Sequence, residues 1–168
     1  TVQTSSLAVV VDKSQELSGQ TINATGHNDT LTGSIYNDTI NGGNGDDVIS
    51  GNDGNDTLNG GNGNDTINGG SGDDKIYGEY GDDIITGGKG NDYLNGGYGN
   101  DTYIWNLGDG FDTIYDYENS STSGRADKIK FGEGIELSDL SFSREGSDLK
   151  IIVNHDPNQG ILIDEYFS

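Results

Sequence analysis

A nine-residue unit recurs in register over residues 24–104, and it limits what the chain can fold into more than any other feature. Each unit follows the pattern G-G-x-G-x-D-x-U-x, in which U is a large aliphatic or aromatic residue. The units that fit it fully begin at Gly42, Gly60, Gly69, Gly87 and Gly96. The units that begin at Gly51 and Gly78 lose only the second glycine. Those at Ala24 and Gly33 are degenerate at the glycines but keep the aspartate and the aliphatic residue in phase.

The sixth and eighth positions carry two separate roles. The sixth is aspartate in every unit: Asp29, Asp38, Asp47, Asp56, Asp65, Asp74, Asp83, Asp92 and Asp101. The eighth is apolar in every unit: Leu31, Ile40, Ile49, Leu58, Ile67, Ile76, Ile85, Leu94 and Tyr103. Because side chains alternate between the two faces of a strand, x-U-x predicts a short strand with U inward and its Thr and Asn neighbours outward. Each unit therefore predicts a six-residue turn followed by a three-residue strand.

The turn chemistry favours calcium. Glycines at positions 1, 2 and 4 permit positive φ, so backbone carbonyls can face an ion, and the aspartate supplies a carboxylate at the turn's exit. Calcium takes six to eight oxygen ligands of these two kinds, whereas magnesium prefers to keep several waters. The chain has no cysteine and only two histidines, which argues against zinc or copper.

Composition predicts disorder in the absence of such an ion. The formal net charge is −21, and hydrophobic residues are only 29% of the chain. Low hydrophobicity with high charge is typical of disordered chains. One buried aliphatic residue per unit cannot offset the entropy of ordering nine backbone residues. We therefore expect folding to be coupled to metal binding.

The charge also excludes partners. Nucleic-acid binding depends on Lys and Arg neutralising phosphates, and there are only 8 of these against 29 acidic residues. An anionic membrane surface is disfavoured for the same reason. No apolar run approaches the roughly 18 residues of a membrane-spanning helix, so we expect no membrane insertion.

The repeat resembles the RTX (repeats-in-toxin) nonapeptide, over about residues 24–115. The resemblance implies an all-β fold: a parallel β-roll, a right-handed solenoid similar to a β-helix, in which two units form one 18-residue coil. Turns then alternate between two edges, and neighbouring turns on one edge share a calcium ion. One edge would hold Asp29, Asp47, Asp65, Asp83 and Asp101, and the other Asp38, Asp56, Asp74 and Asp92. This arrangement implies about seven or eight ions.

The candidate metal ligands are the repeat aspartates, glycine carbonyls and two asparagines. Asp112 joins the nine aspartates, because residues 108–114 partly resume the motif with Asp112 and Ile114 in phase. The degenerate glycines of the first unit put a site between the Asp29 and Asp47 turns in doubt. The remaining candidates are Gly33, Gly42, Gly45, Gly51, Gly54, Gly60, Gly63, Gly69, Gly72, Gly78, Gly81, Gly87, Gly90, Gly96, Gly99, Asn44 and Asn62.

The flanks are expected to close the roll, since a stack of strands exposes an edge at each end. We expect residues 1–23 to form an N-terminal strand or cap, residues 24–115 to form the roll, and residues 116–168 to form a C-terminal β cap. The expected strands of the cap span 127–131, 140–143, 149–153 and 161–163, with a hairpin turn at 146–147 and a Ser-rich loop at 119–124. The aromatic residues Tyr103, Trp105, Phe111, Tyr115 and Tyr117 form either a hydrophobic plug or a sugar-stacking platform.

Nothing in the sequence predicts an enzyme. His27 and His155 lack the partners of a catalytic triad, and the paired acids, such as Asp46 and Asp47, recur as a ligand pattern would. Tyr80 and Tyr98 share position 3 on one edge, as an aromatic contact patch or as surface decoration.

By resemblance, we expect a non-enzymatic module of a larger secreted bacterial protein, a toxin, enzyme or adhesin. It would pass a type I secretion machinery unfolded and fold in extracellular calcium. The alternative is an adhesin or epimerase-like module whose outward face binds a polysaccharide or receptor.

Overall fold

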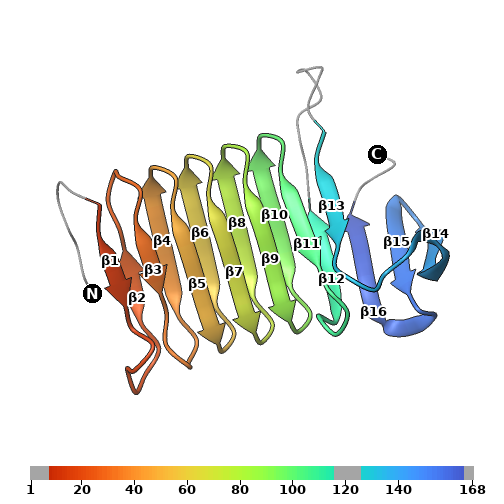
Figure 1. Cartoon of the computed structure of the whole chain (residues 1–168), viewed down its shortest axis with the longest axis horizontal. Coiled ribbons are helices and arrows are strands. Elements are labelled where there is room, and N and C mark those ends of the chain that lie inside the picture. Colours follow the sequence, from red (N-terminus) through yellow and green to blue (C-terminus); the bar gives the residue numbers. More distant parts are fainter. Residues whose placement is uncertain (1–7, 116–125, 165–168) are drawn as a thin grey trace.

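Two β-sheets, parallel throughout the repeats and wound from one continuous solenoid, form the body of the molecule (Figure 1). The structure is a computed structural model and describes residues 8–115 and 126–164. One sheet has the order β1-β3-β5-β7-β9-β11-β13, and the other β14-β15-β16-β12-β10-β8-β6-β4-β2. The first comprises β1 Val10–Asp12, β3 Thr30–Thr32, β5 Val48–Asp53, β7 Thr66–Ser71, β9 Ile84–Lys89, β11 Thr102–Trp105 and β13 Lys128–Phe131. The second comprises β2 Thr21–Asn23, β4 Thr39–Asn44, β6 Thr57–Asn62, β8 Lys75–Tyr80, β10 Tyr93–Tyr98, β12 Phe111–Tyr115, β14 Leu140–Glu145, β15 Asp148–Val153 and β16 Asp156–Asp164.

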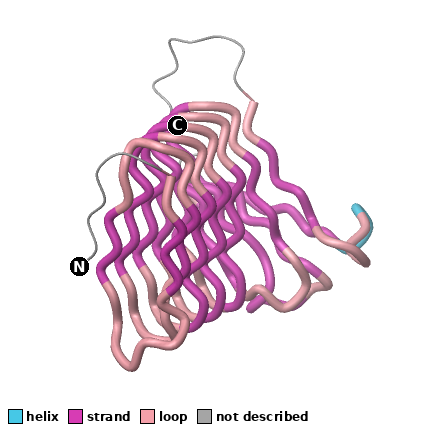
Figure 2. Tube along the Cα trace, turned by 60° about the vertical axis from the view of Figure 1, so that its left-hand side comes forward, coloured by secondary structure: helices cyan, strands magenta, loops and turns pink. Residues whose placement is uncertain are grey.

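Each coil contains two repeat units. Strands pair with their second neighbour in the chain, and the register shift in the regular coils is 18 residues, as in Ile40 opposite Leu58 and Ile49 opposite Ile67. The tube trace in Figure 2 shows these coils stacked one behind another. The all-β parallel roll predicted from the repeat is thereby confirmed.

The strands are longer than the sequence analysis predicted. From β4 to β10 each has six residues, so positions 1–3 of a unit continue the strand begun at positions 7–9 of the unit before. Glycine-rich backbone at positions 1–3 keeps its hydrogen bonds to the next coil, as Gly43 and Gly61 pair in register. Only positions 4–6 then remain as the turn.

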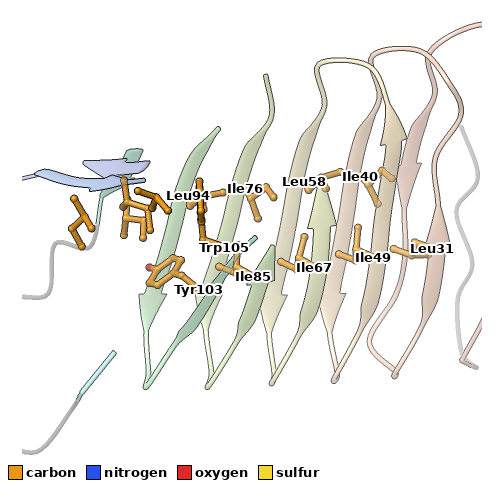
Figure 3. Close-up of a cluster of buried hydrophobic side chains, with 14 of the residues drawn as sticks. Leu31, Ile40, Ile49, Leu58, Ile67, Ile76, Ile85, Leu94, Tyr103 and Trp105 are labelled. Carbon is orange, nitrogen blue, oxygen red and sulfur yellow. The ribbon is translucent and has the colours of Figure 1, made fainter. Parts of the chain in front are cut away.

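A ladder of apolar side chains in two rows, one row from each sheet, fills the interior (Figure 3). The eighth-position residues from Leu31 to Tyr103 are at most 2% exposed, and Ile22 extends the ladder by one coil toward the N-terminus. Residues at position 7, such as Val48 and Ile84, are 50% and 42% exposed. The predicted inward and outward alternation is therefore confirmed.

The N-terminal residues belong to the same two sheets. β1 pairs with β3 and β2 with β4, both in parallel. We expected an N-terminal strand or cap within residues 1–23; this segment contributes β1 and β2, and residues 1–7 lie outside the described residues.

The C-terminal residues add further strands to both sheets. β13 pairs with β11 and β16 with β12, both in parallel. β14 and β15 form the predicted hairpin, and β15 pairs antiparallel with β16. A 3-10 turn, η1 Leu137–Asp139, precedes β14. The loop expected at 119–124 and residues 165–168 lie outside the described residues.

Two of the expected end aromatics plug the roll. Tyr103 and Trp105 are 2% and 1% exposed, and the Trp105 ring meets Phe131 of β13 edge-on at 6.0 Å between centroids. Phe111 and Tyr115 are half-buried on the outer face, and Tyr117 lies outside the described residues. In the described part of the chain, no helix is long and apolar enough to cross a bilayer.

Candidate metal centres

The repeat aspartates form two columns, one along each edge of the roll. In each column, Oδ1 of one aspartate accepts a hydrogen bond from the backbone N–H of the aspartate one coil earlier. On the first edge the N–H groups of Asp29, Asp47, Asp65 and Asp83 donate to the next aspartate at 2.7 to 2.8 Å. On the second edge Asp38, Asp56, Asp74 and Asp92 donate at 2.7 to 3.0 Å, the last of them to Asp112. The predicted sorting of these aspartates into two edges is therefore what the coil produces.

The second oxygen of these carboxylates is left without a partner. Within the described residues, Oδ2 is buried and accepts no hydrogen bond in seven aspartates: Asp47, Asp56, Asp65, Asp74, Asp83, Asp92 and Asp101. A buried polar atom with no partner is costly, and an ionised one is more so. Seven repetitions of the same defect indicate that an absent group completes the turns.

The pKa values of these buried aspartates are raised, because the carboxylates are desolvated. The pKa of Asp65, Asp74 and Asp83 is raised to about 7, chiefly by desolvation and to a smaller extent by the neighbouring carboxylates. Burial likewise raises the pKa of Asp112 to about 8. A cation bound among these carboxylates would favour their ionised form and lower these pKa values.

In the seven units with an unpaired Oδ2, the glycine at position 1 makes room for that oxygen. A Cβ on Gly42 would overlap Oδ2 of Asp47 and the carbonyl oxygen of Gly60 in the next coil. Gly51 stands in the same relation to Asp56 and to the carbonyl of Gly69. A carboxylate oxygen and a carbonyl oxygen from neighbouring coils thus face the same small space.

The glycines at positions 2 and 4 act through their backbone conformation instead. Gly43 has φ 110° and Gly45 has φ 115°, and the other fourth-position glycines of the regular units repeat this. We expected positive φ at position 1 as well, but none of the first-position glycines adopts it. Their requirement is steric.

The donor set fits calcium. Among the described residues, no group of three or more His, Cys, Asp or Glu side chains converges as a ready metal site. An ion here would take one carboxylate oxygen from a turn together with backbone carbonyls, and a ligand shell made of oxygen alone suits a hard cation.

Two candidate ligands have other contacts. Asn44 and Asn62 lie exposed on the outer face, where Nδ2 of Asn62 donates to Oδ1 of Asn44 at 2.7 Å. The carbonyl of Asn62 also accepts the N–H of Gly45 at 2.8 Å. Their side chains therefore do not join the carboxylate columns.

Sequence reasoning missed one member of the first column. Oδ1 of Asp127 accepts the N–H of Asp101 at 2.6 Å, in the place that the next repeat aspartate would take. The signal was present, since Asp127 and Ile129 stand in the D-x-U relation just before β13. Asp127 follows Asp101 by 26 residues in place of the regular 18, so it falls outside the repeat period.

A second, exposed ladder at position 5 was also missed. Oδ1 of Asn28 accepts the N–H of Asp46, whose own Oδ1 accepts the N–H of Asn64. The first member of an acid pair, such as Asp46, is therefore exposed, and its side chain accepts a hydrogen bond from the next coil.

The remaining candidates lie on the surface. His27 and His155 are exposed. Tyr80 and Tyr98 are about half exposed, and their rings stack at 5.0 Å between centroids with an interplanar angle of 7°.

Together, the coil and its turns define a class: a solenoid of short repeats with a buried carboxylate column on each edge. A family model described as the RTX calcium-binding nonapeptide repeat (4 copies) matches residues 23–58, 50–79 and 77–114. The chain belongs to this family, whose repeats bind calcium.

Two known proteins are similar to parts of this chain. Iron-regulated protein FrpA of Neisseria meningitidis serogroup C is 47% identical over 66 residues, which are 39% of this chain and 6% of FrpA. The chain therefore spans only a small part of that relative's length. The crystal structure of extracellular lipase LipA from Serratia marcescens matches with a TM-score of 0.35 and 18% identity, over 85% of this chain and 37% of LipA.

Proposed function

We propose that this chain is the folding module of a secreted protein and that calcium, once bound at its turns, completes its interior. The observation that carries the proposal is the set of seven buried, unpartnered carboxylate oxygens. Extracellular calcium modules bind in the range of about 10⁻⁴–10⁻³ M. The chain would therefore stay unfolded at cytosolic calcium and fold outside the cell, after type I secretion.

The ligands proposed for each turn are one aspartate Oδ2 and the carbonyls of the glycines around it. Asp47 with the Gly60 carbonyl represents the first edge, and Asp56 with the Gly69 carbonyl the second. The bound ion supplies positive charge that offsets the repulsion along each column and lets the buried carboxylates stay ionised.

Circular dichroism during a calcium titration tests the proposal. In EDTA at neutral pH we expect a spectrum without β-structure, and a cooperative change to a β spectrum as calcium reaches the millimolar range. Magnesium at the same concentration is the control and should leave the chain unfolded. A β spectrum that is indifferent to chelation would sink the proposal.

A groove on the first sheet supports a second candidate function, binding of a neutral polysaccharide. It has a volume of about 640 Å³ and crosses β5, β7 and β9 on their outer face. Asn68, Thr86 and Lys89 offer hydrogen-bonding groups along it, and Gly70 and Gly88 leave it without bulk. The net charge of −21 disfavours an anionic polysaccharide unless calcium bridges it.

A glycan array probed with the calcium-loaded chain tests this candidate. We expect binding that is lost in EDTA and weakened in the double variant Asn68→Ala, Thr86→Ala. The matched control is Asn59→Ala, on the other sheet. If the loaded chain binds no glycan on the array, the folding function stands alone.

A further inference from the structure

The two degenerate N-terminal turns differ from the seven others in how they treat their aspartate. Oδ2 of Asp29 accepts the N–H of Thr25 at 3.0 Å and its hydroxyl at 3.2 Å. Oδ2 of Asp38 accepts the N–H of Ser34 at 2.5 Å, and the Ser34 hydroxyl donates to Oδ1 at 3.1 Å. Both carboxylates are buried, yet neither has an unpartnered oxygen. These turns are already complete without a further group.

The difference depends on the backbone at position 2. In the seven units with an unpaired Oδ2, the residue at position 2 has positive φ: Gly43, Asn52, Gly61, Gly70, Glu79, Gly88 and Gly97. Among the described residues other than glycine, only four have positive φ, and Asn52 and Glu79 are two of them. Thr25 and Ser34 do not, and there the N–H of position 2 points at the carboxylate instead. The units at Gly51 and Gly78 therefore keep the regular turn despite their lost glycine.

We propose that the backbone conformation at position 2 decides which turns bind calcium: the seven turns with an unpaired Oδ2 bind it, and the Asp29 and Asp38 turns are closed by their own Thr25 and Ser34. The inference rests on the proposed function, which it deepens by assigning the sites. The first coil then binds no calcium at its own two turns, and the calcium-binding coils stack on it.

The residue at position 1 of each closed turn predicts whether that turn can be converted into a calcium site. Gly33 retains the regular space, since a Cβ there would overlap Oδ2 of Asp38 and the carbonyl of Gly51. In the other unit this position is Ala24, which places a real Cβ there. Replacing Ser34 by glycine should therefore open a new calcium turn, whereas replacing Thr25 by glycine should not.

The number of ions bound per chain at saturating calcium, from native mass spectrometry and equilibrium dialysis, tests the inference. We expect seven for the unaltered chain and the same number for Asp38→Asn. The matched variant on the same edge, Asp74→Asn, should bind one fewer. Since both variants keep an Oδ1 acceptor, stability losses shift the calcium midpoint but not the count at saturation.

The gain-of-site variants make the test two-sided. Ser34→Gly should bind one ion more than the unaltered chain, and Thr25→Gly should bind no more. A count above seven for the unaltered chain, a lower count for Asp38→Asn, or an unchanged count for Ser34→Gly would overturn the inference. If the unaltered chain binds no calcium at all, the proposed function itself fails.

Discussion

The backbone N–H of Asp47 donates to Oδ1 of Asp65, one coil later, at 2.7 Å, while Oδ2 of Asp65 is buried without a partner. The two oxygens of this carboxylate thus have different roles. Oδ1 joins consecutive coils, and Oδ2 is available to an ion. Folding and calcium binding are therefore two consequences of the same side chain.

The roles of the two oxygens can be tested separately with the variant Asp65→Asn. The amide keeps an oxygen for the Asp47 N–H but replaces the ligand oxygen with an N–H donor. We expect the free energy of unfolding in saturating calcium to fall by about 2 kcal/mol, the range for a bond to a charged group. Urea denaturation measures it.

The control for that variant is its neighbour in the exposed ladder, Asn64→Asp. Oδ1 of Asn64 accepts the N–H of Asp82, and aspartate preserves this acceptor. A loss as large as that of Asp65→Asn would mean that the buried oxygen has no special role.

The steric role of the first-position glycine is tested by Gly60→Ala. Gly60 does not have positive φ, so alanine fits its backbone, but the new Cβ would overlap Oδ2 of Asp65. We expect about one calcium ion fewer per chain and a higher calcium midpoint.

Gly26→Ala is the matched substitution, because a Cβ there would meet only the Asn44 amide at 3.6 Å. It should leave the midpoint nearly unchanged. Equal effects from the two alanines would point to a general loss of backbone freedom rather than to the site.

Two adjacent isoleucines test the interior ladder. Ile85 is fully buried, whereas Ile84 is 42% exposed. Ile85→Ala should lower the free energy of unfolding in calcium by about 2–5 kcal/mol. Ile84→Ala should lower it by less than about 1 kcal/mol. Equal losses in urea denaturation would contradict the assigned faces.

The pH dependence should change sign with calcium. In the metal-free roll, burial raises the pKa of Asp65 and Asp83 to about 7 from an ordinary 3.8. Between about pH 4 and 7 the folded chain then holds protons that the unfolded chain has lost, so the stability of the metal-free roll falls as pH rises through this window. We expect more β signal in EDTA at pH 4.5 than at pH 8.

Calcium competes with those same protons. The calcium midpoint should therefore rise as pH falls below about 7. Sedimentation velocity at each pH checks that the low-pH signal comes from monomers, since the sequence pI is about 4.1. A midpoint that is equal at pH 6 and pH 8 would contradict protonation of the ligand carboxylates.

Much of the roll could be predicted because one period fixes both its strands and its turns. The eighth-position residues, from Leu31 to Tyr103, were placed in the interior from the alternation of faces alone. The two edges followed from the 18-residue coil that the RTX resemblance implies. What escaped prediction was the extent of the strands, because glycines at positions 1 and 2 have low strand propensity and only pairing with the next coil extends the strand over them.

The details of the turns also needed the structure. Asp127 was missed because residues that break the period separate it from Asp101. Thr25 and Ser34 looked like degraded glycines, and only the hydrogen bonds show that they satisfy a carboxylate. Asn52 and Glu79 looked equally degraded, yet both adopt the φ of the glycine they replace.

Small-angle X-ray scattering of the whole chain, in EDTA and then in calcium at neutral pH, tests most directly whether calcium is a structural part of the interior. Without calcium we expect the radius of gyration of an unfolded chain, about 40 Å for this length. With calcium it should fall to about 15–20 Å, as for a compact domain with some elongation. A compact particle of equal radius in both solutions would contradict the account, since the roll would then fold around its unpaired carboxylates without an ion.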